Sequence, residues 1–137
     1  MIHYTDSPDG ISASQLNGGF FVGWLNQPDT DAHLRVLQGS YRIWLALDDD
    51  KVVGFINAIS DGVLAAFIPL LEVLPEYQGQ GIGLELTRRM LESLDHLYSI
   101  DLMCDDDVVP FYEKLGMKRA GGMLTRNYQN QSGYKPG

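Results

Sequence analysis

The sequence has a single cysteine, Cys104, and few basic residues for its length. One cysteine excludes an internal disulfide framework and any metal site that needs several thiolates. Ten Lys and Arg stand against 18 Asp and Glu, a formal net charge of −8. This balance disfavours nucleic acid as a partner, because phosphate backbones are bound by clustered basic side chains. No apolar run approaches the roughly 20 residues that span a bilayer, and no leader of basic then apolar residues opens the chain. These absences predict a soluble, cytoplasmic protein with no membrane partner.

The 137 residues, of which 45% are hydrophobic, are enough for one domain with a sound core, and we expect a single domain over residues 1–137. The negative charge is uneven. Residues 1–87 contain eleven acidic and three basic side chains, whereas residues 88–137 contain seven of each. Two interpretations stay open: the acidic excess serves solubility, or it attracts a cationic acceptor.

The first half of the chain predicts two helices and most of a sheet. A short strand is expected at residues 2–4, a helix at 11–25 that Gly18 and Gly19 weaken, and a helix at 30–37 with Thr30 as its N-cap. Residues 41–47 and 52–59 form a hairpin, and Asp61-Gly62 leads into a long apolar strand at 63–74. Pro69 cannot donate to a strand ladder, so we expect a bulge near it.

The second half predicts alternating helices and strands. The strongest helix covers residues 81–95, with an apolar stripe made by Ile82, Leu86, Met90 and Leu94. A buried strand at 98–104, a short helix at 108–115 and one or two closing strands at 117–128 follow. A helix between two strands favours parallel pairing, so the sheet should be mixed, antiparallel first with one parallel pair in the middle.

Residues 71–83, Leu-Glu-Val-Leu-Pro-Glu-Tyr-Gln-Gly-Gln-Gly-Ile-Gly, carry the most chemical information. A strand ends, and three alternating glycines open a helix. Such a turn exposes backbone N–H groups at the positive end of the helix dipole, which suits a pyrophosphate. A purely structural turn would waste the glycines. A dinucleotide-binding turn would need its third glycine at position 84, which is Leu84.

A third interpretation rests on family resemblance. Gln78-x-x-Gly81-x-Gly83 resembles the Arg/Gln-x-x-Gly-x-Gly/Ala signature of the GNAT superfamily of acyl-CoA-dependent acetyltransferases. The run from Pro110 to Met117 is similar to the family's second signature, although Met117 replaces the common phenylalanine. Asp105 stands where many members carry an asparagine. The resemblance implies an α/β (α+β) fold: a mixed, mostly antiparallel sheet of six or seven strands, with one central parallel pair splayed apart and about four flanking helices.

The resemblance also implies an activity and its residues. The chain would be an N-acetyltransferase, an acyltransferase of the EC 2.3.1 class, that moves the acetyl group of acetyl-CoA to an amine in a ternary complex. The backbone of Leu71 and Val73 would hold the pantetheine arm, with the Val73 N–H as oxyanion donor. Tyr112 would be the general acid, since a phenol can protonate a departing thiolate. The residues expected to contact the cofactor are Leu71, Val73, Gln78, Gly79, Gln80, Gly81, Ile82, Gly83, Phe111 and Tyr112.

Several assignments stay open. Glu72 is the first choice for the general base, with Asp101, Asp61 and a chain of waters as alternatives. Cys104 is expected to be a small buried residue. The three histidines lack ligand spacing, so no metal is predicted. Residues 26–31 would border the acceptor site by analogy of fold. The acceptor would be a small-molecule amine or a peptide or protein amine, cationic or not, and a homodimer is open through a strand at 124–128.

Two rival functions remain. The first is a non-catalytic acyl-CoA-binding or sensor domain that kept the turn and lost turnover. The second is a nucleotide-binding domain that uses residues 79–83.

Overall fold

The computed structural model describes residues 1–136. A single five-stranded sheet runs in the order β1-β2-β3-β4-β5. Its strands are β1 (Ile2–Thr5), β2 (Arg42–Asp48), β3 (Lys51–Ser60), β4 (Ala65–Val73) and β5 (Ser99–Leu102). The first four pair antiparallel, and β4 pairs with β5 in parallel. The predicted mixed sheet with one parallel pair is confirmed.

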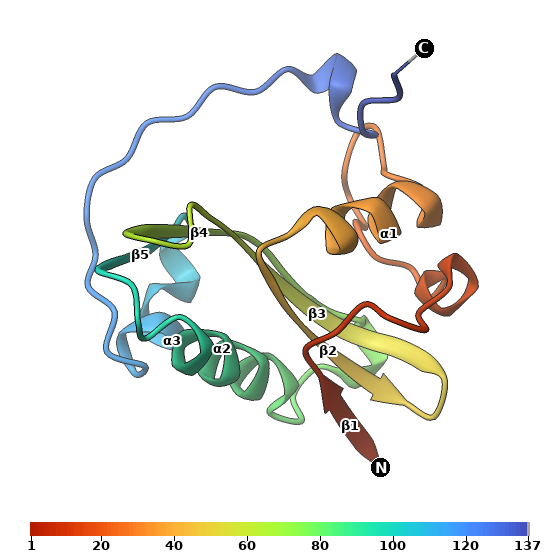
Figure 1. The fold of residues 1–137 in the computed structure, drawn as a ribbon, viewed down its shortest axis with the longest axis horizontal. Coiled ribbons are helices and arrows are strands. Elements are labelled where there is room, and N and C mark those ends of the chain that lie inside the picture. The colour runs from red at the N-terminus through yellow and green to blue at the C-terminus, as the bar shows by residue number, and fades with distance from the viewer. Residues whose placement is uncertain (137) are drawn as a thin grey trace.

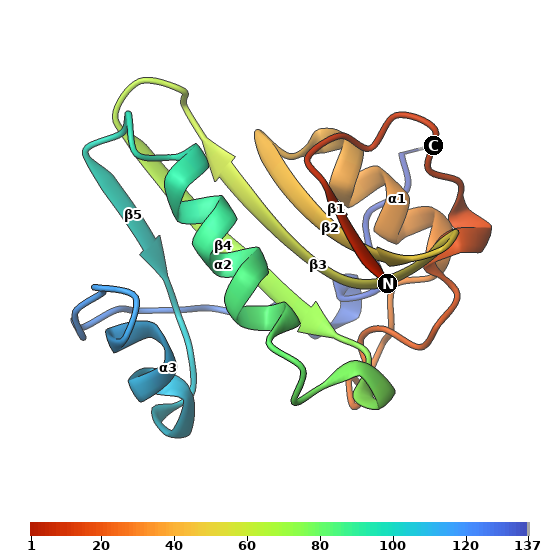
Figure 2. The ribbon, with the colours of Figure 1, turned by 90° about the horizontal axis from the view of Figure 1, so that it is seen from below.

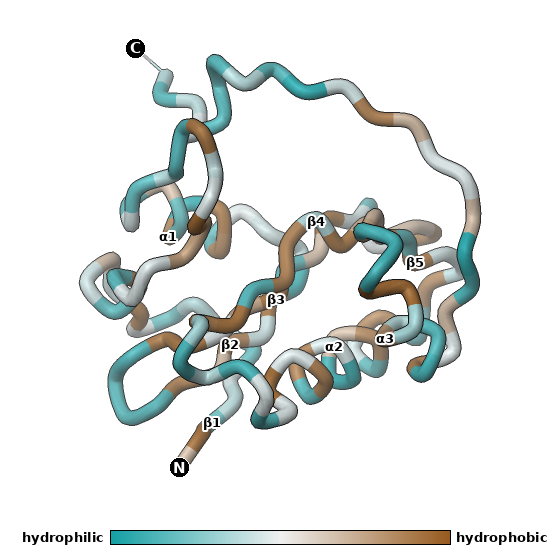
Figure 3. Tube along the Cα trace, turned by 180° about the vertical axis from the view of Figure 1, so that it is seen from behind, coloured by the Kyte–Doolittle hydropathy of each residue, from teal (hydrophilic) through white to brown (hydrophobic). Residues whose placement is uncertain are grey.

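Helices cover both faces of this sheet (Figures 1 and 2). α1 (Thr30–Gly39) lies on one face and α2 (Ile82–Ser93) on the other, while α3 (Val109–Glu113) follows β5. Short 3-10 turns occur at η1 (Ala13–Leu16), η2 (Pro75–Tyr77), η3 (Asp106–Val108) and η4 (Tyr128–Asn130). The apolar stretches of the trace gather along β3, β4 and the inner side of α2 (Figure 3). No helix in this described part of the chain is both long and apolar enough to cross a membrane.

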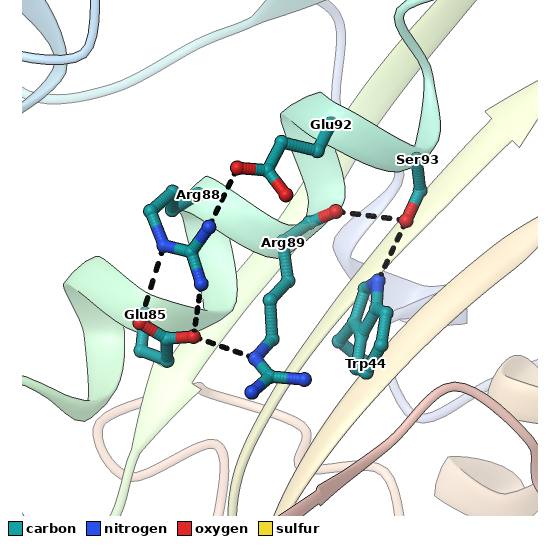
Figure 4. A network of polar contacts seen from close by, with 6 residues as sticks. All are labelled: Trp44, Glu85, Arg88, Arg89, Glu92 and Ser93. Atoms are coloured by element: carbon teal, nitrogen blue, oxygen red, sulfur yellow. Dashed lines mark hydrogen bonds and ion pairs between the residues drawn. The ribbon is translucent and has the colours of Figure 1, made fainter.

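The α2 helix forms as its sequence predicts. Its stripe of Ile82, Leu86, Met90 and Leu94 is buried against the sheet. On the outer side, Glu85, Arg88, Arg89 and Glu92 form a chain of ion pairs three and four residues apart (Figure 4). Such pairs support the exposed face of a helix, each by about 0.2–0.5 kcal/mol.

Residues 11–25 do not form the predicted helix. Only η1 is helical, and the rest is a loop whose glycines turn the chain, with φ of +107° at Gly19 and +88° at Gly23. At Gly18 a Cβ would stand 2.5 Å from Leu74 Cδ1, so the chain passes too close to the core for a larger residue. The apolar side chains of this segment, Phe20 and Phe21, are buried from a loop instead of a helix.

The predicted N-cap of α1 is also wrong by one residue. Asp29, and not Thr30, is the cap, because its side chain accepts a hydrogen bond from the Ala32 N–H at 2.8 Å. A carboxylate at this position satisfies a free amide and interacts favourably with the helix dipole.

The closing strands predicted at 117–128 are absent from the part of the chain that the structure describes, so the sheet has five strands instead of six or seven. The same residues form three α-helices, where about four were expected. Residues 117–127 run as an extended, exposed segment with no helix or strand. Met123 and Leu124 are adjacent, so they would point to opposite faces of a strand and cannot give it one apolar side. As a result β5 is the edge of the sheet and only half-buried, not the buried inner strand that was expected.

Candidate active site

The centre of the site is the point where β4 and β5 separate. The parallel pairing ends with Ile68 opposite Leu102, while β4 continues to Val73 beside β3 alone (Figure 2). Between Ile59 and Asn57 of β3 the register shifts, because β4 contributes Ile68 and Pro69 against a single residue. The bulge predicted near Pro69 is confirmed, and beyond it one side of β4 has no neighbouring strand.

Hydrogen bonding shows which backbone groups face that open side. The Leu74 N–H donates to the Val53 carbonyl of β3 at 2.8 Å. Because successive N–H groups of a strand alternate in direction, those of Leu71 and Val73 point away from β3. The side-chain amide of Gln78 reaches the Val73 carbonyl on this open side at 3.0 Å. The two amides predicted to hold a pantetheine arm therefore face the gap.

Two neighbouring cavities follow this part of β4. The larger, about 320 Å³, lies between β4, the end of β5 and the loop before α1, and it includes Leu71, Glu72 and Tyr112 in its walls. The smaller, about 250 Å³, includes Glu72, Val73 and Gln78. Glu72 lines both cavities, and none of the Lys and Arg residues within 1–136 lines either of them.

Glu72 lies on the α1 face of the sheet, opposite Phe55 of β3. Its Oε1 accepts a hydrogen bond from the Phe21 N–H at 2.9 Å. Val73 points to the other face, where its Cγ2 would lie 3.7 Å from a Cβ at Gly83. Burial raises the pKa of the Glu72 carboxyl above its ordinary 4.5, and the Phe21 hydrogen bond partly opposes this. A carboxylate with a raised pKa at a cavity wall suits a general base.

The contact between the loop at Phe21 and the Glu72 carboxylate was not predicted from the sequence. Phe21 has φ of +65°, a left-handed conformation that is rare for a bulky residue. Its carbonyl accepts hydrogen bonds from the Gln27 side chain at 2.9 Å and the Trp24 N–H at 3.2 Å. Residues 19, 20, 22 and 24 line the cavities, whereas none of residues 26–31 does. The run of glycines at 18, 19 and 23 was the signal for a turning loop.

Tyr112 projects from α3 between two cavities. It lines the one at the end of β4 and a third, about 530 Å³, on the outer side of β5. Burial raises the pKa of its phenol, and the nearby Cys104 adds to this rise. Phe111 packs edge-on against Tyr112, with ring centroids 5.0 Å apart, and lines none of the three cavities.

The glycine turn has the backbone geometry of an anion site. Gly79 and Gly81 have φ of +80° and +84°, and Gly81 is the N-cap of α2. A glycine cap has no side chain to accept from the first amides of the helix, which leaves them free for an anion. The Ile82 side chain is buried in the core, so only its backbone faces the turn. Gln80 is exposed beside it.

The other candidate residues have other roles or surroundings. The Asp61 carboxylate accepts from the Val63, Leu64 and Ala65 N–H groups, which lowers its pKa, so it caps a turn. Asp101 and Cys104 line the outer cavity of β5, away from Glu72. Cys104 is exposed, and the expectation of a buried cysteine is wrong, because the strand ends two residues before it. Across residues 1–136, no three His, Cys, Asp or Glu side chains gather as metal ligands would.

Known proteins resemble this chain in both sequence and structure. Residues 13–117 match the Acetyltransferase (GNAT) family. The crystal structure of a candidate acetyltransferase from Deinococcus radiodurans R1 is 48% identical, with a TM-score of 0.94 over 98% of this chain and 94% of that one. A GNAT-family protein from Streptococcus pneumoniae TIGR4 is 32% identical, with a TM-score of 0.75 over 93% and 98% of the two chains.

Curated sequences match over a shorter region. The uncharacterized N-acetyltransferase ycf52 of Pyropia yezoensis is 33% identical over 100 residues, which are 69% of this chain and 58% of that protein. The match thus spans little more than half of this relative. The family match alone covers most of the residues that form the sheet, α2 and the glycine turn. The chain belongs to the GNAT family of acetyltransferases.

Proposed function

We propose that the chain, acting as one domain over residues 1–137, transfers the acetyl group of acetyl-CoA to an amine by direct attack in a ternary complex. The observation that carries this proposal is the separation of β4 from β5 after Ile68, which leaves Glu72 and Tyr112 on the walls of one cavity. Family membership implies the use of acetyl-CoA. The residues present fit that molecule.

Two stretches of backbone fit the two ends of the cofactor. The Leu71 and Val73 amides face the gap beside β4 and match the amide groups and thioester of a pantetheine arm. The turn at residues 78–83, with its uncapped helix amides, matches the pyrophosphate. The side chain of Gln78 joins them by its hydrogen bond to the Val73 carbonyl.

Three groups of the chain each assist one step of the acetyl transfer. Bound acetyl-CoA supplies an acetyl thioester, a good acyl donor. The Val73 N–H donates a hydrogen bond to the acyl oxygen as negative charge gathers there. Glu72 removes a proton from the acceptor ammonium, so that a neutral amine can attack. Tyr112 delivers its phenolic proton to the departing sulfur, and its raised pKa keeps that proton in place at neutral pH.

The walls of the site favour a cationic amine as acceptor. Among the residues that the structure describes, Glu72 is the single carboxylate on the two cavities beside β4, and no basic side chain lines them. The neighbouring Val22, Trp24 and Leu70 are apolar and suit the carbon chain that carries the amine. This arrangement supports an amine over an acidic acceptor.

The first experiment is a calorimetric titration of the purified protein with acetyl-CoA and CoA, with NAD and ATP as controls. We expect binding of the first two alone, followed by amine-dependent thiol release in a screen of small amines and peptide N-termini. A folded protein that binds neither form of CoA would overturn the proposal. Binding of NAD or ATP in their place would indicate that the glycine turn recognises a nucleotide.

A further inference from the structure

The hydrogen bond from the Phe21 N–H to Glu72 depends on how Phe21 itself is held. A tetrahedral Cα carries the backbone nitrogen, the carbonyl carbon and the side chain, so holding two of these in place determines the direction of the third. The Phe21 ring is buried and packs against Trp24 and His33, with ring centroids 4.9 Å and 5.0 Å away. Because the core holds the ring, the direction of the N–H depends on what holds the Phe21 carbonyl.

Gln27 is the side chain that holds this carbonyl. Its Nε2 donates to the Phe21 carbonyl oxygen at 2.9 Å, and the Trp24 N–H donates to the same oxygen at 3.2 Å. Phe21 has φ of +65°, an angle that a bulky residue rarely adopts. The two hydrogen bonds to its carbonyl therefore oppose a return to negative φ, a rotation that would turn the N–H away from Glu72.

The segment that carries Gln27 is held on both sides. On one side, Asn26 binds the C-terminal part of the chain. Its Nδ2 donates to the Tyr128 carbonyl and its N–H donates to Gln131 Oε1, both at 2.8 Å. On the other side, Asp29 caps α1. Figure 1 shows the C-terminal end of the chain beside α1 and the loop before it, so residues far apart in the sequence hold this loop together.

Gln27 and Asn26 are both exposed, and neither lines the cavities beside β4. An effect of either side chain on the reaction must therefore pass through Phe21 to Glu72, which lines both cavities. The contacts from the C-terminal turn at residues 128–131 through Asn26, Gln27 and Phe21 to Glu72 are called the relay here.

We propose that Gln27 is a positioning residue for Glu72: it holds the Phe21 carbonyl, and thereby the N–H that binds the carboxylate, while the C-terminal turn supports it through Asn26. The effect on catalysis rests on the proposed function, whereas the relay itself does not. Displacement of a catalytic group by about 1 Å can lower a rate by about 10². Because the Trp24 N–H still holds the Phe21 carbonyl, loss of the Gln27 contact should lower the rate less than this.

Amide hydrogen exchange, followed by NMR, tests the relay without reference to activity. Gln27→Met has nearly the length of glutamine and no donor for the Phe21 carbonyl. We expect the Phe21 N–H to exchange about tenfold faster in this variant, since one hydrogen bond changes an opening equilibrium by up to about that factor. The Leu64 N–H, which donates to the Asp61 carboxylate at 2.8 Å, is the internal control and should be unchanged. An unchanged exchange rate at Phe21 would overturn the proposal.

The part of the C-terminal turn is tested at Asn26. Asn26→Ala removes the donor to the Tyr128 carbonyl and leaves Gln27 in place. We expect exchange of the Phe21 N–H to become faster, by a smaller factor than in Gln27→Met, because the Gln27 hydrogen bond is retained. Exchange as slow as in the unmodified protein would overturn the role of the C-terminal turn.

Acetyl transfer to two kinds of amine tests whether Gln27 acts through Glu72. An aliphatic amine has a pKa of about 10 and is protonated at neutral pH. An aromatic amine is neutral there, so no base is needed before it attacks. We expect Gln27→Met to lower kcat/KM about tenfold for the aliphatic amine, and to leave the aromatic amine and the affinity for CoA unchanged. Glu72→Gln should show the same selectivity more strongly, and adding Gln27→Met to it should cost nothing further.

Gln15→Met is the matched control, because the Gln15 Nε2 donates to the Asp50 carbonyl at 2.8 Å and the residue lines neither cavity beside β4. It should leave both rates and the exchange of the Phe21 N–H unchanged. An equal loss for both amines in Gln27→Met would show a general distortion and overturn the proposal. Full activity of that variant beside an impaired E72Q would overturn the proposal alone. Full activity of E72Q would reject the general base of the proposed function, and with it this role of Gln27.

Discussion

The backbone N–H of Phe21 donates a hydrogen bond to Oε1 of Glu72 at 2.9 Å. The two residues are 51 positions apart, and Phe21 adopts φ of +65° where it makes this contact. Backbone strain in a bulky residue persists only where its surroundings enforce it, and such residues concentrate at functional sites. The contact engages one oxygen of a carboxylate whose residue lines both cavities beside β4.

Replacing Glu72 by glutamine should lower kcat/KM for an amine acceptor by about 10²–10³ at neutral pH, because general-base catalysis contributes on this scale. Glutamine keeps an oxygen for the Phe21 N–H, so the loop should hold its place. In the unmodified enzyme, activity should rise with pH as Glu72 loses its proton, with a midpoint above the ordinary 4.5. The measurement is a pH–rate profile, in which E72Q should lack this rise. Asp101→Asn is the matched control and should keep it.

The same variant should be more stable than the unmodified protein at pH 7. Burial raises the folded-state pKa of Glu72, so the neutral acid is the form that favours folding. Its contribution is fully present below the unfolded pKa and is lost as pH rises through the folded pKa. Glutamine stays neutral throughout, so the gain in melting temperature should grow with pH above about 4.5. Glu76→Gln, at an exposed carboxylate, should show no such gain. An equal or lower stability of E72Q at pH 7 would count against the burial of this charge.

Tyr112→Phe should lower kcat by about 10² or more while CoA still binds, because the ring and its packing against Phe111 remain and only the acidic proton is lost. Kinetics and calorimetric titration on the same preparation separate the two effects. Tyr98→Phe, at an 86% exposed tyrosine, is the control and should leave both unchanged. Turnover that survives in Y112F would remove the phenol from the mechanism. A parallel loss of CoA binding would make Tyr112 a binding residue instead.

Alanine substitutions at two glycines of the turn should have different effects on stability. Gly81 has φ of +84°, and a Cβ there costs about 1–2 kcal/mol, so Gly81→Ala should lower the melting temperature by several degrees. Gly83 lies inside α2, where a Cβ would meet only Val73 Cγ2 at an ordinary 3.7 Å. Gly83→Ala should therefore keep or raise stability and still weaken CoA binding by crowding the helix amides. Thermal melts with CoA titration check both, and unchanged CoA affinity in Gly83→Ala would place the anion elsewhere.

The parts of the site that depend on residues close together in the chain were predicted correctly from the sequence. Pro69 lacks an N–H, which fits an edge or a bulge, and its apolar flanks favoured the bulge. The bulge is where β4 leaves β5. The apolar stripe of α2 and the glycine turn could also be predicted from the sequence. The stripe follows from the helical spacing of its apolar residues, and the turn follows from glycines that can adopt positive φ.

The predictions that were wrong concern segments whose structure depends on contacts with residues far away in the chain. Phe20 and Phe21 look like part of a helix in sequence, but the core accepts them from a loop, and Gly18 is small because Leu74 lies against it. Nothing near Phe21 in the chain indicates that its N–H binds Glu72. Residues 117–127 resemble a strand in sequence, yet within residues 1–136 they pair with no strand. Register and docking of this kind are tertiary properties that propensity does not contain.

His33 provides a last test, of how the aromatic cluster on the α1 face responds to acid. It is 2% exposed, its ring lies 4.3 Å from that of Phe55, and its Nε2 has no hydrogen-bond partner within residues 1–136. Burial lowers its pKa from 6.5 to about 4. Stability from the neutral ring is fully present above the unfolded pKa of 6.5 and is lost as pH falls to the folded pKa, in total about 3 kcal/mol. His33→Leu should remove this dependence between pH 6.5 and 4, whereas His3→Leu, at an exposed histidine, should keep it. Urea unfolding at a series of pH values measures the difference, and an identical pH dependence for His33→Leu and the unmodified protein would show that burial does not lower the pKa of His33.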